Sequence, residues 1–236
     1  MANLKIIYED DHIIVVDKPY GVASQTERGT GEDMVSILMN YFHESSIANS
    51  GKQKAAPYVG VVHRLDKNVG GVMVYGKTKA STAKLSAQMA EHTTEKAYYA
   101  IAYSPENIGE EGIMTDYLIR DGRTNTSRVA GKTEWNLKDA KKAELSYKLI
   151  KLSEDKDKGL FDIDLKTGRH HQIRVQFSSR GCPLLGDRKY GQEANKDYAG
   201  RNIELYCHHI GIKHPVTGKR MSFDGIKAEE MYNKLT

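Results

Sequence analysis

A short charged segment between two apolar stretches holds the residues best suited to chemistry. The letters HRLD occupy residues 63–66, between the apolar residues 59–62 and 72–75. An arginine beside Asp66 favours the ionised carboxylate, because a nearby positive charge lowers the pKa of a carboxyl group. An aspartate held in its ionised form suits nucleophilic or electrostatic catalysis better than proton donation. The same letters also fit an ordinary polar turn capped by Asp and Asn.

A second group of ionisable side chains lies in residues 167–181, TGRHHQIRVQFSSRG. The spacing predicts a helix over residues 170–179, on which His170 and Arg174 share a face. Arg169 would then lie at the helix N-terminus, where arginine side chains and the helix dipole favour phosphate or carboxylate. The segment is therefore a candidate anion-binding surface, with a solvated basic face as the alternative.

Two pairs of adjacent histidines, 170–171 and 208–209, suggest a metal-dependent hydrolase or phosphodiesterase. Adjacent side chains on a helix or strand point in different directions, and neither HExxH nor paired-cysteine spacing accompanies them. We therefore expect no metal. Tyr98 and Tyr99 lie in a predicted strand, where alternation turns one ring inward. Such a ring serves either the core or the stacking of a base.

The composition limits the class of protein. The chain has 236 residues and a net charge of +4, a mildly basic balance that allows nucleic acid as a partner. Cys182 and Cys207 form no paired motif, so we expect free thiols in a reducing compartment. No apolar run approaches the roughly 18 residues of a membrane span. We expect a cytoplasmic protein that is monomeric and has no membrane contact.

Alternating and helical patterns predict an α+β fold in one domain, with a mostly antiparallel sheet and flanking helices. A turn at residues 18–21 (KPYG) should end the second strand, and residues 44–57 read as an exposed loop. Residues 104–139 read as short β-prone pieces. The expected strands are 4–8, 12–17, 95–103, 143–152, 161–165, 203–212 and 220–223, and the expected helices are 33–43, 79–92, 170–179 and 226–235.

Together these stretches resemble the RluA-type pseudouridine synthases. Residues 13–21 (IIVVDKPYG) are similar to the first strand and KP-x-G turn of that family, and HRLD resembles its catalytic loop. Residues 167–191 are similar to its long carboxy-terminal motif almost throughout. A K-x-Y strand at residues 96–98 and a His-Pro pair at 214–215 also match. Three signatures in this order and spacing are far more specific than HRLD alone.

The resemblance implies an enzyme that isomerises uridine to pseudouridine in structured ribosomal or transfer RNA, without metal or cofactor. It also implies a sheet with a central catalytic cleft. Asp66 would be the catalytic carboxylate, and its attack on the sugar, attack on the base and abstraction of a ribose proton all stay open. Arg169 would pair with that carboxylate. Tyr98 would stack on the flipped base, replacing the stacking lost when the base leaves the RNA.

The resemblance also implies the surroundings of the uridine. Ile173 would supply an apolar wall, while His63 and Arg64 would organise the loop and engage RNA. His170 and Arg174 complete the expected substrate contacts, and His170 stands where the family more often has Thr or Ser.

The chain departs from the family pattern at residues 69–71, where Val-Gly-Gly replaces the usual Thr-Ser-Gly. No RNA-binding module of the S4 type precedes the motifs, so RNA selection is expected to rest on the catalytic domain or on RNA shape. The alternative is a catalytically silent protein of the same fold that binds or folds RNA. Retention of Asp66, Tyr98 and Arg169 argues against that alternative.

Overall fold

The computed structural model describes residues 4–26, 32–50 and 57–235. Its internal contacts divide the chain into two compact units. Unit 1 comprises Met1–Thr94 and His209–Ile226, and unit 2 comprises Glu95–His208 and Lys227–Thr236. The single domain predicted from composition stays a prediction beside this division.

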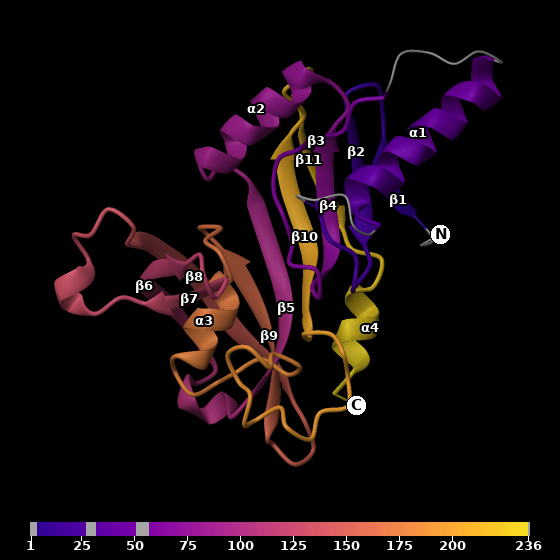
Figure 1. Ribbon diagram of the computed structural model, residues 1–236. Helices are drawn as coiled ribbons and strands as arrows, with labels where there is room; N and C mark the ends of the chain where they lie inside the picture. Colours follow the sequence, from indigo (N-terminus) through magenta and orange to yellow (C-terminus); the bar gives the residue numbers. More distant parts are fainter. Residues whose placement is uncertain (1–3, 27–31, 51–56, 236) are drawn as a thin grey trace. The chain divides into compact units, whose positions relative to one another are not determined.

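Unit 1 is built on antiparallel strand pairs: β1 with β2, β2 with β4, β3 with β4, and β10 with β11 (Figure 1). β10 begins in unit 2 and its carboxyl half, from His209, belongs to unit 1. The elements are β1 (Lys5–Glu9), β2 (Ile13–Lys18), α1 (Met34–Ser50), β3 (Gly60–Val61), β4 (Gly70–Gly76), α2 (Lys79–Ala90), β10 (Leu205–Lys213) and β11 (Arg220–Asp224).

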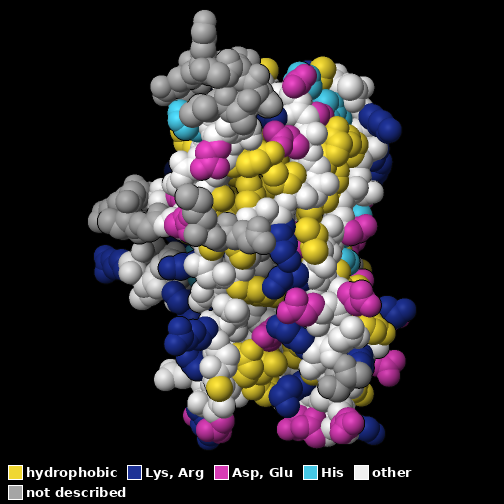
Figure 2. All heavy atoms as spheres, turned by 90° about the vertical axis from the view of Figure 1, so that its right-hand side faces the viewer, with side chains coloured by type: hydrophobic (Ala, Val, Ile, Leu, Met, Phe, Trp, Pro, Cys, Tyr) yellow, Lys and Arg dark blue, Asp and Glu magenta, His cyan; other side chains and the backbone are white. Residues whose placement is uncertain are grey.

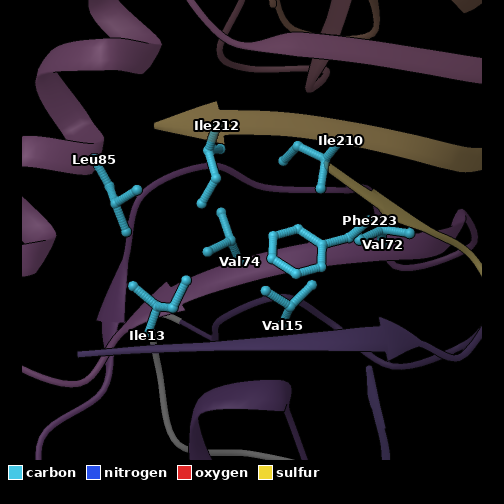
Figure 3. Close-up of a cluster of buried hydrophobic side chains, with 8 residues drawn as sticks. All are labelled: Ile13, Val15, Val72, Val74, Leu85, Ile210, Ile212 and Phe223. Carbon is cyan, nitrogen blue, oxygen red and sulfur yellow. The ribbon is translucent and has the colours of Figure 1, made fainter. Parts of the chain in front are cut away.

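The core of unit 1 forms on one side of β2 and β4, both of which are buried along their whole length. Near-continuous apolar runs are typical of strands covered on both faces. Alternate residues of these strands point into one cluster, to which α2 adds Leu85 (Figure 3). The buried members are Ile13, Val15, Val72, Val74, Leu85, Ile210, Ile212 and Phe223.

Unit 2 is an antiparallel sheet in the strand order β5-β9-β8-β6-β7, with α3 packed against it (Figure 1). Its elements are β5 (Glu95–Tyr103), β6 (Glu111–Asp121), β7 (Thr126–Val129), β8 (Lys141–Leu152), β9 (Lys158–Leu165), α3 (Gln172–Ser178), α4 (Ala228–Asn233) and two 3₁₀ turns at Pro105–Asn107 and Lys132–Glu134. Among the described residues, every strand pairing given for the two units is antiparallel, which confirms the predicted α+β class.

Aromatic packing fixes α3 on the sheet of unit 2. The ring of Phe177 meets Phe161 edge-on, with centroids 5.4 Å apart, and Tyr147 in the same manner at 5.8 Å. Ile173, one turn earlier in α3, is also buried.

Several predicted boundaries differ from the observed ones, and two of the differences change how residues are interpreted. The first helix does not end near residue 43 but continues to Ser50, so residues 44–50 are helical rather than a loop; the rest of that predicted loop, apart from Pro57, lies outside the described residues. The helix predicted from residue 170 begins at Gln172, because His171 adopts the left-handed conformation with φ 54°. His170 therefore precedes the helix and does not share a helical face with Arg174.

The surface carries both signs of charge. On the face drawn in Figure 2, Lys and Arg side chains are interspersed with Asp and Glu. The two cysteines are buried and are not joined in a disulfide. Across the described ranges, no helix is long and apolar enough to cross a membrane.

Candidate active site

Strand register places the loop that contains Asp66 beside the turn that follows β2. The loop, residues 62–69, connects β3 to β4 in unit 1. β2 pairs antiparallel with β4, and Lys18 at the end of β2 lies opposite Gly71 at the start of β4. The segment after Lys18 therefore leaves the sheet where the loop enters it. This is why two motifs nearly fifty residues apart in sequence meet.

Hydrogen bonds fix the backbone on both sides of Asp66. Ser24, which is buried, donates from Oγ to the carbonyl of Leu65 at 2.7 Å and accepts from the Leu65 N–H at 2.9 Å. The carbonyl of Lys67 accepts from the Gly21 N–H at 2.8 Å. Asp66 itself is half-buried between these two anchored residues. Sequence reasoning missed Ser24, because nothing local distinguishes a serine that binds a distant backbone.

Lys18 places a buried amino group next to the loop. Its side chain is fully buried, and Nζ donates to the carbonyls of Pro19 and Val22 at 2.9 and 2.7 Å. A longer contact of 3.4 Å reaches the carbonyl of Lys67. Burial lowers the pKa of Lys18 to about 7, while the charges of Asp66 and Asp17 act to raise it. When protonated, Lys18 is thus a buried cation whose charge interacts with that of Asp66, in addition to the exposed arginine predicted from the sequence.

Two further contacts shape the loop. The Val74 N–H donates to Nε2 of His63 at 3.1 Å, which joins the start of the loop to β4. A side chain at Gly70 would bring its Cβ within 2.9 Å of the Tyr20 ring, so glycine leaves room for that ring. Gly70 is one of the residues at which the chain differs from the usual Thr-Ser-Gly. Its lack of a side chain makes room for Tyr20 of the KPYG turn. Arg64 is exposed.

Strand alternation in β5 places Tyr98 and Tyr99 in different surroundings. Tyr98 is buried and lies opposite Ile163 of β9. Tyr99 is half-buried and stacks on His208, with ring centroids 3.9 Å apart. Nε2 of His208 is 2.9 Å from a carboxylate oxygen of Asp162. The prediction that one tyrosine points inward is confirmed for Tyr98.

A buried glutamine holds the segment that carries Arg169. Oε1 of Gln172 accepts from the Thr167 hydroxyl at 2.8 Å and from the Arg169 N–H at 3.0 Å. Its Nε2 donates to the carbonyl of Glu144 at 3.1 Å. The half-buried Arg169 side chain donates from Nε to the carbonyl of Lys142 at 2.8 Å. The backbone of this segment is therefore fixed in unit 2 by Gln172, which sequence reasoning did not identify.

The histidine pair at 170–171 is also engaged within unit 2. The two rings stack with centroids 3.7 Å apart. Nδ1 of His170 is 2.9 Å from the Ser127 hydroxyl, and Nδ1 of His171 is 2.7 Å from the Tyr190 hydroxyl. In the part of the chain that the structure describes, no three His, Cys, Asp or Glu side chains are grouped to hold a metal ion.

Arg174 has a partner other than the predicted substrate. Its guanidinium binds Asp187 through two hydrogen bonds, Nε to Oδ2 at 2.7 Å and Nη2 to Oδ1 at 2.9 Å. Both side chains are buried, with 7% and 1% of their surfaces exposed. The guanidinium also lies 5.1 Å from the centroid of the Tyr190 ring. This pair joins α3 to a later part of the long motif at residues 167–191. A substrate contact by Arg174 stays a prediction.

The predicted site residues thus fall into two sets, and the structure describes each set in its own unit. Unit 1 brings together His63, Arg64 and Asp66 on one loop. Unit 2 contains Tyr98, Arg169, His170, Ile173 and Arg174.

Comparison with known proteins decides the family. A family model described as RNA pseudouridylate synthase matches residues 12–179. The chain belongs to this family. Ribosomal large subunit pseudouridine synthase D of Zymomonas mobilis is 31% identical, over 97% of this chain and 70% of that protein. An uncharacterized RNA pseudouridine synthase of Aquifex aeolicus is 34% identical, over 94% of this chain and 68% of that protein.

A solved structure shares the fold of this chain. Human RNA pseudouridylate synthase domain containing 1 superposes with a TM-score of 0.70, covering 94% of this chain and 82% of that one. At 18% sequence identity, this similarity shows the fold. Membership of the pseudouridylate synthases makes the chain an isomerase that converts uridine in RNA to pseudouridine.

Proposed function

We propose that Asp66 is the carboxylate that carries out the isomerisation. The observation that supports this most directly is the fixed backbone on both sides of it, at Leu65 and Lys67. Catalysis by a single carboxylate depends on its placement, and a displacement of about 1 Å can cost about 10²-fold in rate. The reaction breaks the N1–C1′ bond, joins C5 to C1′ and releases the proton of C5. It needs no oxidant or reductant.

The remaining roles follow the family resemblance. Tyr98 stacks on the flipped uracil, an interaction worth about 1–3 kcal/mol per base. Ile173, buried on α3, supplies an apolar wall. Arg64 is exposed and contacts RNA, while His63 holds the loop through Val74. The ion pair of Arg169 with the catalytic carboxylate, and substrate contact by His170, are part of the same proposal.

We propose ribosomal RNA as the substrate. Relatives from Zymomonas mobilis and Pseudomonas aeruginosa are named ribosomal large subunit pseudouridine synthase D, and one from Rickettsia bellii is named synthase C. The substrate would be a structured stem-loop, since base flipping costs least where stacking is already weak. Action in the cytoplasm and as a monomer is part of the same proposal.

Tritium release from RNA labelled at uridine C5 tests the substrate. Unmodified ribosomal and transfer RNA transcripts are incubated separately with the protein. We expect release from the ribosomal transcript alone. Release from transfer RNA alone would overturn the proposed substrate. Absence of release from both, with RNA binding intact, would favour the catalytically silent RNA-binding protein.

A further inference from the structure

Lys96 lies on the same face of β5 as the proposed stacking residue. Burial alternates along this part of the strand, so that Lys96, Tyr98 and Ala100 are buried and the residues between them are half-buried. Residues two apart on a strand are separated by about 6.6–6.8 Å and point to the same side. Only 7% of the Lys96 surface is exposed. A lysine is rarely so buried without a partner for its charge.

Unit 2 supplies no such partner for Lys96. Among its described residues, none accepts a hydrogen bond from Nζ or forms an ion pair with it. Burial lowers the pKa of Lys96, and the ionisable group that acts to raise it is the buried thiol of Cys207. Burying an ammonium without a hydrogen-bonded counter-charge is unfavourable. Within unit 2, the burial of this lysine is therefore unfavourable to stability.

Nζ of Lys96 is placed next to exposed backbone. A Cβ atom built on Gly168 would lie 3.5 Å from Nζ, and Gly168 itself is exposed. The residues on either side are fixed by Gln172, through the Thr167 hydroxyl and the Arg169 N–H. Nζ of Lys96 therefore lies beside an exposed glycine in a turn whose flanking residues are fixed. A group from outside the unit has an approach there.

We propose that Lys96 binds a backbone phosphate of the RNA beside the uridine that stacks on Tyr98. This proposal rests on the proposed function, because it takes RNA as the ligand of this face of β5. A phosphate provides hydrogen-bond acceptors and a negative charge, which the described residues of unit 2 do not provide for the ammonium. Lysine provides a compact, flexible point charge for such a contact. Binding of RNA then relieves the unfavourable burial.

The variant Lys96→Met tests this, because it keeps the buried stem and removes the charge. We expect a melting temperature equal to or above that of the wild type, since an unfavourable buried charge is gone. Binding to the responsive RNA transcript should weaken, and its salt dependence should change. Each phosphate contact contributes about 0.7–0.9 to the slope of log K against log salt, so the slope should fall by that amount. KM should rise more than kcat falls.

Two further variants sharpen the test. Lys148→Met removes an equal charge from an exposed lysine of β8 and should leave the salt slope nearly unchanged. Lys96→Arg keeps a positive charge and should retain most of the slope. A lower melting temperature of Lys96→Met with an unchanged slope would overturn the proposal and make the lysine structural. If the wild type binds RNA but releases no tritium, the proposed function fails. In that case, a slope of log K against log salt that is lowered only in Lys96→Met still supports the phosphate site.

Discussion

Two buried lysines in different units have opposite surroundings. Lys18 in unit 1 is fully buried, and its ammonium donates to the carbonyls of Pro19 and Val22. Lys96 in unit 2 is almost as buried, yet no described residue of its unit accepts from it. A third buried cation, Arg174, is matched by a carboxylate, Asp187. Burial alone therefore does not reveal the role of a cation; its partners do.

The difference separates structural from binding residues. Where the protein supplies the partners, as for Lys18 and Arg174, removal of the cation leaves buried acceptors or a buried charge unpaired. Where it does not, as for Lys96, removal relieves the free protein and harms only its complex. We therefore expect the three cations to respond differently to the same substitution by methionine.

The largest effect on stability is expected for Arg174→Met. The variant leaves the carboxylate of Asp187 buried without its counter-charge, which costs about 3–5 kcal/mol in the free energy of unfolding. Urea denaturation measures the change. The double variant Arg174→Met with Asp187→Asn should recover part of the loss, because no buried charge then remains. A loss below 1 kcal/mol, on the order of an exposed pair, would contradict this account.

A smaller loss of stability is expected for Lys18→Met, together with a loss of activity. The carbonyls of Pro19 and Val22 lose their donor, at a cost of about 1–3 kcal/mol. The turn beside the loop of Asp66 would shift, and kcat should fall by about 10²-fold with KM little changed. Urea unfolding curves measure the loss of stability, and tritium-release kinetics measure the fall in kcat. Full activity after this substitution would show that Lys18 does not position the loop.

The control for Lys18 is Ser24→Ala, which loosens the same loop without removing a charge. It removes both hydrogen bonds to Leu65, and we expect about 1 kcal/mol of lost stability with a smaller fall in kcat. If Ser24→Ala lowered kcat as much as Lys18→Met, loop geometry would account for the effect. If only Lys18→Met lowered it, the positive charge near Asp66 would be the cause.

Most of the fold could be predicted from the sequence, because local patterns encode it. The strand predicted over residues 95–103 coincides with β5, and the helix predicted over 79–92 matches α2 closely. The wrong boundaries lie where the local sequence pattern does not determine the structure. The polar end of α1 reads as a loop, and the left-handed conformation of His171 has no local signal in a non-glycine residue.

The site was predictable only in part. Asp66 could be identified as a candidate because it lies in the HRLD motif. Tyr98 could be identified because it lies in the K-x-Y motif of a predicted strand, where side chains alternate. Ser24, Gln172 and Asp187 could not be assigned their roles. Ser24 and Asp187 act through contacts 41 and 13 residues away in the chain, and Gln172 reaches the carbonyl of Glu144 28 residues away. Strand register and side-chain burial create such contacts, and neither can be obtained from residue types alone.

Tritium release by Asp66→Asn tests the central claim most directly. Asparagine keeps the size of the side chain and removes the carboxylate, so the anchors at Leu65 and Lys67 should persist. We expect release from the responsive transcript to fall by at least about 10³-fold. The melting temperature and most of the RNA affinity should remain. Release close to the wild-type rate would contradict the assignment of Asp66 as the catalytic carboxylate.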